Sequence, residues 1–244
     1  METLIAFWNI LKKDIKNYYL KPPNISWGII FPLSWTLMQL IRSPGDVGIV
    51  ELLPGLMAMS ILFGTTSMLA VTITFEKRSK SFDRLLLAPI SISILVSAKI
   101  LGAILFGIVN AFVPVIFAAF LVDLRGVSWG IALVAVVLIA ITSALLGLLV
   151  AVSVREVFEA QTLSNFFRFP MLFLCGLFIP IDKLPAILKP ISFCLPLTYG
   201  ADMLNSAIIH SSSFNILLSF AIMLLFIIVL FYLCKRNIEK KWIL

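Results

Sequence analysis

The residues that most often carry catalysis or bind metals are few in this chain and lie far apart. There is one histidine, His210, and no HExxH motif places a second metal ligand near it. The three cysteines, Cys175, Cys194 and Cys234, are odd in number and show no CxxC spacing, so neither a disulfide framework nor a zinc site is expected. A GxxxxGKS/T phosphate-binding loop is also missing. The sequence therefore predicts no catalytic residue, metal site or cofactor in this chain, and a membrane enzyme acting on lipid is disfavoured.

The densest group of charged side chains lies at residues 75–93. Glu76 and Lys80 stand four residues apart, a spacing at which opposite charges support a helix. Phe82, Leu85 and Leu86 gather on one face of that helix, and Pro89 ends it. The segment is predicted to be a short amphipathic helix that offers a docking surface to a soluble partner.

The composition shows what must position this segment. Of the 244 residues, 61% are apolar and 13% are charged, whereas soluble domains are about half apolar and a quarter charged. A membrane-spanning helix needs about 20 mostly apolar residues. Six such runs occur: residues 25–41, 52–74, 94–122, 129–154, 166–181 and 214–234. We therefore expect an all-α integral membrane protein with six transmembrane helices.

The basic residues predict an orientation in the membrane. With six spans, 15 of the 19 Lys and Arg residues, Arg168 among them, fall on the side that carries both ends of the chain. The positive-inside rule then places both termini in the cytoplasm. The net charge of +7 is thus an orientation signal, and no nucleic-acid partner is expected. Ionisable residues are nearly missing from the predicted hydrocarbon depth, which disfavours a proton-coupled carrier or a channel.

Two segments flank or interrupt the predicted spans. Residues 1–22 have apolar side chains at helical spacing with lysines opposite, which is typical of an amphipathic helix on the membrane surface; a solvated tail is the alternative. Residues 23–244 form the transmembrane domain. Within it, residues 182–205 are broken by Pro185, Pro190 and Pro196, which favours re-entrant outer helices over an ordinary external loop.

Two motifs carry a resemblance to a known family. The first is Glu76-Lys-Arg-Ser-Lys-Ser-Phe-Asp-Arg-Leu-Leu-Leu-Ala-Pro-Ile-Ser91, and the second is Gly176-Leu-Phe-Ile-Pro-Ile-Asp-Lys-Leu-Pro185 followed by Pro196-Leu-Thr-Tyr-Gly-Ala-Asp202. Together with the chain length and the expected topology, they resemble the membrane subunit of type-2 ABC exporters over nearly the whole chain. Arg78, Lys80 and Asp83 depart from the family pattern and make the first motif more basic.

The resemblance implies a working unit and a place for each segment. Two permease subunits and two ATPase subunits would assemble in the plasma membrane of a prokaryote, with ATP and Mg²⁺ bound by the ATPase. Residues 76–91 would be the coupling helix that contacts the ATPase, and residues 4–20 the connecting helix beside it. The residues expected there are Glu76, Arg78, Phe82, Asp83, Arg84, Leu85, Leu86 and Pro89.

The resemblance also implies a substrate path along spans two and five and an outer gate. The path would be lined by Met59, Phe63, Thr66, Phe166, Phe169 and Phe173, and the gate by Pro180, Pro185, Pro196 and Tyr199. Such a lining suits an amphipathic or lipid-like substrate, although these side chains could equally face lipid or neighbouring helices. A homodimer and a pair of related permeases are both open. The alternative function is a non-transporting membrane scaffold that binds a soluble partner through the charged segment.

Overall fold

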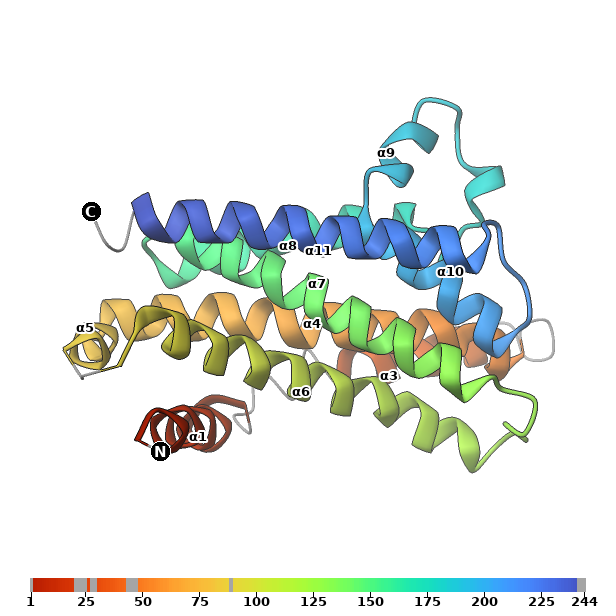
Figure 1. Ribbon diagram of the computed structural model, residues 1–244. Coiled ribbons are helices and arrows are strands. Elements are labelled where there is room, and N and C mark those ends of the chain that lie inside the picture. Colours follow the sequence, from red (N-terminus) through yellow and green to blue (C-terminus); the bar gives the residue numbers. More distant parts are fainter. Residues whose placement is uncertain (1, 20–25, 27–29, 43–47, 88–89, 241–244) are drawn as a thin grey trace.

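The computed structural model describes residues 2–19, 26, 30–42, 48–87 and 90–240. These residues form helices and connecting segments, with no strand among them. Four of the helices are long and apolar enough to cross a membrane: α4 (Ile49–Arg78), α6 (Ile92–Ala119), α7 (Trp129–Ser153) and α11 (Ile216–Ile238). They run alongside one another in Figure 1. The all-α class expected from composition is therefore confirmed.

Two further helices lie where the first and fifth spans were predicted. α3 (Phe31–Arg42) has 12 residues, and α8 (Val157–Leu174) has 18, several of them polar. Neither is long and apolar enough to be a candidate span, so the described residues contain four candidates and not six. Most of residues 25–29, at the start of the predicted first span, lie outside the described residues.

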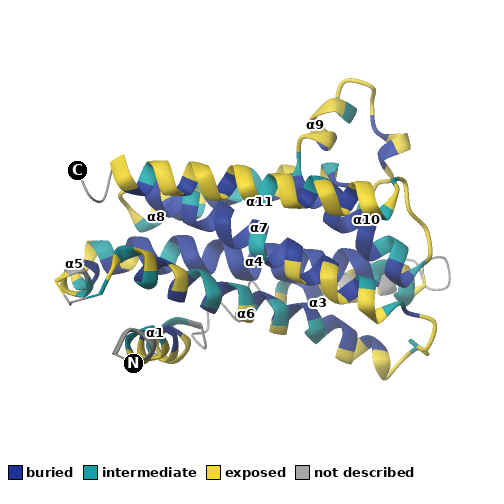
Figure 2. Ribbon diagram, viewed as in Figure 1, coloured by how far each residue is buried: buried dark blue, intermediate teal, exposed yellow. Residues whose placement is uncertain are grey.

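α4 is the central helix of the molecule. Its most apolar stretch is 94% buried, whereas that of α11 is 17% buried, and Figure 2 shows α4 mostly dark blue and α11 largely yellow. Helices α6, α7, α8 and α10 pack around α4. A helix that is apolar on all sides must be enclosed by protein or by lipid. α4 is enclosed by protein, and α11 leaves most of its surface for lipid.

Small residues allow α4 and α7 to approach closely. A Cβ atom at Gly147 of α7 would lie only 2.7 Å from the backbone oxygen of Thr66 in α4. At the same contact the Thr66 hydroxyl donates a hydrogen bond to the Ser143 carbonyl oxygen, at 3.3 Å. Close backbone contact and interhelical hydrogen bonds hold helices together where lipid removes the hydrophobic drive.

Side-chain caps explain where several helices begin and end. The Ser91 hydroxyl accepts a hydrogen bond from the Ile94 amide at 3.4 Å and starts α6, and the Asn215 side chain starts α11 in the same way. α8 continues through Pro170 and ends at Leu174. Gly176 follows with a φ of +82°, a left-handed conformation that glycine adopts without steric strain.

The charged segment at residues 75–93 is divided into two helices, which corrects the expectation of one. Residues 75–78 are the last turn of α4, and a turn at Ser79 and Lys80 separates them from α5 (Ser81–Leu86). The Ser79 and Ser81 hydroxyls both donate to the carbonyl oxygen of Glu76, each at 3.2 Å. These bonds satisfy a carbonyl that the end of α4 leaves without a helical partner.

The two ends of the bundle carry different short elements. At one end lie α5 and α1 (Glu2–Asp14), which is followed by a π-helical turn, Ile15–Tyr19. Figure 1 shows α1 nearly end-on while the long helices run across the picture. At the other end lie a 3₁₀ turn (Ile181–Lys183), α9 (Lys189–Phe193) and α10 (Pro196–Ile208). α10 is buried against α7, α11 and α4, whereas α9 is largely exposed.

Candidate functional site

Four charged side chains meet beside α5 and form a cluster, which we call the ion cluster: Lys13, Asp14, Glu76 and Lys99. Lys99 Nζ of α6 lies 2.9 Å from Asp14 Oδ2 of α1 and 2.6 Å from Glu76 Oε2 of α4. Lys13 Nζ lies 2.6 Å from Glu76 Oε1 and 3.3 Å from Asp14 Oδ1. Each ammonium therefore contacts both carboxylates, and the cluster links three helices.

The ion cluster is buried and electrically balanced. The exposed fractions of Glu76, Lys99 and Asp14 are 0%, 1% and 1%, and only Lys13 reaches solvent, at 32%. Burying a charge is unfavourable unless an opposite charge and hydrogen bonds compensate it. Two positive and two negative groups meet this condition only when α1, α4 and α6 keep their present positions. The cluster therefore fixes α1 against the end of the bundle.

The ion cluster should weaken only in strongly alkaline solution. Burial alone lowers the pKa of Lys13, but the hydrogen bond and charge of Glu76, with the charge of Asp14, outweigh burial and raise the pKa above its ordinary 10.5. A raised folded-state pKa gives a stabilisation that is complete below the unfolded-state pKa and is lost as pH rises through the folded-state value. The melting temperature of Lys13→Met should therefore lie below that of the wild type by a constant amount from about pH 7 to 9, and the gap should close above pH ~11. A gap that already closes below pH 9 would contradict this assignment.

The residues expected on the coupling helix occupy different environments. Glu76 belongs to the ion cluster, and Phe82 is also buried, so neither side chain faces a partner in this structure. Arg78 and Arg84 are exposed and Leu85 is half-buried. Leu87, which was not expected to contribute, is 86% exposed just after α5. The side chains of Asp83 and Leu86, and the whole of Pro89, lie outside what the structure describes.

The residues expected along the substrate path fall into two groups. On α4, the side chains of Met59, Phe63 and Thr66 are buried within the chain. On α8, the side chains of Phe166, Phe169 and Phe173 are 71%, 39% and 44% exposed. One contact joins the groups: the Phe63 and Phe169 rings lie 5.9 Å apart, edge to face.

Arg168 was expected near the cytoplasmic surface, and the structure corrects this placement. Its guanidinium lies beside the middle of α4, 4.7 Å from the Phe63 ring, and its exposed fraction is 0%. It donates hydrogen bonds to Ser67 Oγ and to Asn165 Oδ1, the latter at 2.7 Å. An ionisable group therefore lies beside the middle of a candidate span, where the sequence suggested almost none. The Arg168 position in the predicted fifth span was a signal, but the tally of basic residues counted it on the cytoplasmic side.

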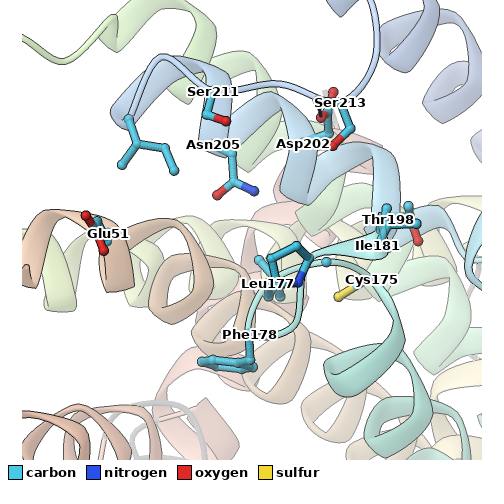
Figure 3. Close-up of a pocket in the computed structure, with 13 residues that line it drawn as sticks. Glu51, Cys175, Leu177, Phe178, Ile181, Thr198, Asp202, Asn205, Ser211 and Ser213 are labelled. Carbon is cyan, nitrogen blue, oxygen red and sulfur yellow. Dashed lines mark hydrogen bonds between the residues drawn. The ribbon is translucent and has the colours of Figure 1, made fainter. Parts of the chain in front are cut away.

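A polar pocket with a volume of about 220 Å³ lies at the α10 end of the bundle, and one of the residues expected at the outer gate, Pro180, lines it. Pro180 lines the pocket together with Glu51 and Asp202, as Figure 3 shows for the two acidic side chains. Asp202 accepts hydrogen bonds from the Ser213 amide at 2.6 Å and from the Ser219 hydroxyl at 3.2 Å. Tyr199 lies nearby on α10 and donates to the Phe193 carbonyl oxygen at 2.9 Å.

The other two predicted gate residues lie on either side of α9. Pro196 begins α10 and is buried, and Pro185 is exposed in the segment before α9. Of the four residues expected at the gate, Pro180 lines the pocket and Tyr199 joins α10 to α9 through its hydrogen bond to Phe193. Within the described residues, no group of three His, Cys, Asp or Glu side chains is placed to hold a metal ion.

These features match a known class of transport protein. A model of the ABC-2 type transporter family matches residues 5–209, which is most of the chain. The chain therefore belongs to the ABC-2 type transporter family, the class of multi-pass permeases that the two sequence motifs indicated. Permeases of this family work with an ATPase carried on a separate subunit.

Individual relatives agree with this class. The chain is similar to the inner membrane transport permease YadH of Escherichia coli strain K12, with 21% identity over 244 residues that cover 97% of this chain and 95% of the relative. YadH of Shigella flexneri matches with the same identity and coverage. The match extends over nearly the full length of both proteins, so it covers the ion cluster, α8 and the polar pocket alike.

Proposed function

We propose that this chain is the permease subunit of an ABC exporter. It moves an amphipathic or lipid-like substrate from the cytoplasm or inner leaflet to the outside by alternating access, which a separate ATPase drives. Two copies of the permease, most simply as a homodimer, and two ATPase subunits form the working unit. The ATPase binds ATP and Mg²⁺. The family membership supports the transporter class, and the ion cluster is the observation that supports the mechanism.

The ion cluster would transmit movement from the ATPase to the membrane. α5 directly follows α4 and packs on it, and the cluster joins the same end of α4 to α1 and α6. An ATPase that pushes α5 would therefore displace α1, α4 and α6 together. Because packed elements move as units and do not deform continuously, this movement would reach the substrate path along α4 and α8.

The proposed orientation places α5 and both termini in the cytoplasm. α3 and α8 complete six spans in the assembled dimer, where α8 lines the path between the two permeases and α4 packs behind it. α9 and α10 form the re-entrant outer gate. The exposed aromatic face of α8 would then meet either the substrate or the second permease, which accounts for large apolar side chains on a helix that also carries polar ones.

Changing Leu87 to aspartate should abolish co-purification of the ATPase. Leu87 is 86% exposed beside α5, so the change removes apolar contact area from the docking surface without opening the core. The tagged chain would be purified from its native membrane in mild detergent, and the ATPase measured by mass spectrometry. The wild type should bring down about one ATPase per permease, and the variant at least tenfold less.

Ile187→Asp is the matched control for this experiment. Ile187 is 80% exposed but lies in the segment before α9, at the opposite end of the bundle. This variant should retain the ATPase. If the folded wild type brings down no ATPase, the exporter proposal fails and the scaffold alternative takes its place. If Leu87→Asp and Ile187→Asp bring down the same amount of ATPase, docking does not occur at α5.

A further inference from the structure

The Arg168 guanidinium is a buried positive charge whose described partners are all neutral. Besides Ser67 Oγ and Asn165 Oδ1, its acceptors are the carbonyl oxygens of Ser164 at 3.2 Å and Phe63 at 3.4 Å. These acceptors satisfy four of the five N–H groups of the guanidinium, but they carry no net charge to offset its charge. Charged groups at this depth in a membrane are unfavourable and normally mark a functional site with a partner of opposite charge.

No carboxylate in the described part of the chain is placed to be that partner. Within the described residues, none of the ion pairs includes Arg168. The nearest acidic residues along the two helices are Glu76 of α4 and Glu159 of α8, each nine positions from the site. At 1.5 Å per residue, nine positions place them about 13 Å away along the helix axis.

The described acidic residues of a second copy do not supply the missing charge either. Asp46 lies outside the described residues, and Asp202 lies within α10, at the far end of the bundle from α5, where it accepts hydrogen bonds from Ser213 and Ser219. The other ten acidic residues stand in short elements, near the ends of helices or in the segments that join them: Glu2, Asp14, Glu51, Glu76, Asp83, Asp123, Glu156, Glu159, Asp182 and Glu239. A symmetric partner carries the same residues at the same levels. The counter-charge at the level of Arg168 must therefore come from outside the permease.

Asn165 connects the buried guanidinium to the exposed face of α8. It is half-buried and stands four residues before Phe169, so both lie on the same face of the helix. Phe166 and Phe173 continue that face, and both are exposed. A ligand lying along the aromatic face would thus have its polar end next to Asn165, whose oxygen lies 2.7 Å from Nη2 of Arg168.

We propose that Arg168 recognises the anionic group of an amphipathic substrate. The anionic group displaces the Asn165 oxygen from Nη2, and the apolar tail lies along Phe166, Phe169 and Phe173. This inference rests on the proposed function and names its substrate class: amphiphiles with a phosphate or carboxylate head. The guanidinium suits this role because both N–H groups of Nη2 can then donate charge-assisted hydrogen bonds to such a group, while Nε and Nη1 stay held by α4 and α8.

The test measures binding of three amphiphiles with the same tail. The full chain, with any ATPase that accompanies it, is placed in nanodiscs of a zwitterionic lipid. Binding of radiolabelled n-decyl phosphate, n-decanol and n-decyltrimethylammonium is measured by equilibrium dialysis against empty nanodiscs, without ATP. Decyl phosphate should bind at least tenfold more tightly than the other two, and inorganic phosphate alone should not compete at the same concentration.

Asn165→Asp is the decisive variant. It places a carboxylate where the amide oxygen now accepts from Arg168, so the chain acquires the counter-charge that it lacks. This variant should melt at a higher temperature than the wild type. Its preference for decyl phosphate over the other two amphiphiles should fall by about tenfold.

Two further variants test the role of the guanidinium and the specificity of the effect. Arg168→Lys, which retains the charge but not the planar group, should weaken binding of decyl phosphate by a smaller factor. Asn215→Asp, an exposed cap that aspartate also satisfies, is the matched control and should bind as the wild type does.

Three results would overturn the inference. Equal binding of the three amphiphiles would remove the preference for an anion, and an unchanged preference in Asn165→Asp would place the anion elsewhere. Full competition by inorganic phosphate would indicate a simple anion site with no role for the tail. Since binding is measured without ATP, it is independent of ATPase co-purification, so failure of the exporter proposal and failure of the substrate class give different results.

Discussion

Replacing Glu76 with alanine should lower the free energy of unfolding by about 3–5 kcal/mol, because it leaves buried charges without their partner. Lys99 is 1% exposed and would lose the carboxylate that now lies 2.6 Å away. Lys13 would lose its closest partner as well, and of the ion cluster only the Asp14–Lys99 pair would still join α1 to the bundle. Denaturant titration of the purified protein, followed by tryptophan fluorescence, measures the change. ATP-driven transport should fall along with stability, since α1 would no longer follow α4.

Arg78→Ala is the control for the effect of burial. Arg78 lies two positions from Glu76 on the same helix and forms an ion pair with Glu156 at 3.7 Å, but both side chains are more than half exposed. Solvent-exposed ion pairs contribute about 0–1 kcal/mol, so this variant should unfold almost as the wild type does. If Glu76→Ala and Arg78→Ala both lower the free energy of unfolding by a similarly small amount, the ion cluster does not hold α1 in place. The proposed transmission through α1, α4 and α6 would then lack its basis.

Replacing Gly147 with leucine should lower the free energy of unfolding by about 2–3 kcal/mol, because the site has no room for a side chain. The first carbon of that side chain would lie 2.7 Å from the Thr66 carbonyl oxygen and 3.1 Å from the Thr66 Cα. Both are backbone atoms, so α4 and α7 would have to move apart. Such a movement would also lengthen the Thr66–Ser143 hydrogen bond. Thermal unfolding in detergent measures the loss.

Gly130→Ala provides the matched comparison for glycine on the same helix. A Cβ atom at Gly130 would have no neighbour within 4 Å, and the position lies in the first turn of α7. Alanine favours the helix over glycine by up to about 1 kcal/mol. This variant should therefore be as stable as the wild type or slightly more so. Equal destabilisation by the two variants would mean that close packing at Gly147 is not what holds α4 to α7.

The sequence alone was sufficient to indicate the class of the protein and the order of its parts. Long apolar runs and a low content of charge identified a helical membrane protein, since these properties depend only on composition along the chain. Local patterns also located the charged segment that contains α5. The two motifs indicated the family that the match over residues 5–209 establishes. Each of these inferences uses residues that lie within a few positions of one another.

The tertiary structure decided which charges are buried and what they contact. Lys99 meets Asp14 across 85 positions, and Arg168 meets Ser67 across 101. Such pairs depend on how each helix is rotated and how far it is shifted along its neighbours, and no local pattern contains that information. The sequence therefore assigned Glu76 to a docking surface and Arg168 to the cytoplasmic side. Packing around α4 placed the first in the ion cluster and the second beside the aromatic face of α8, because helices from distant parts of the chain meet at both places.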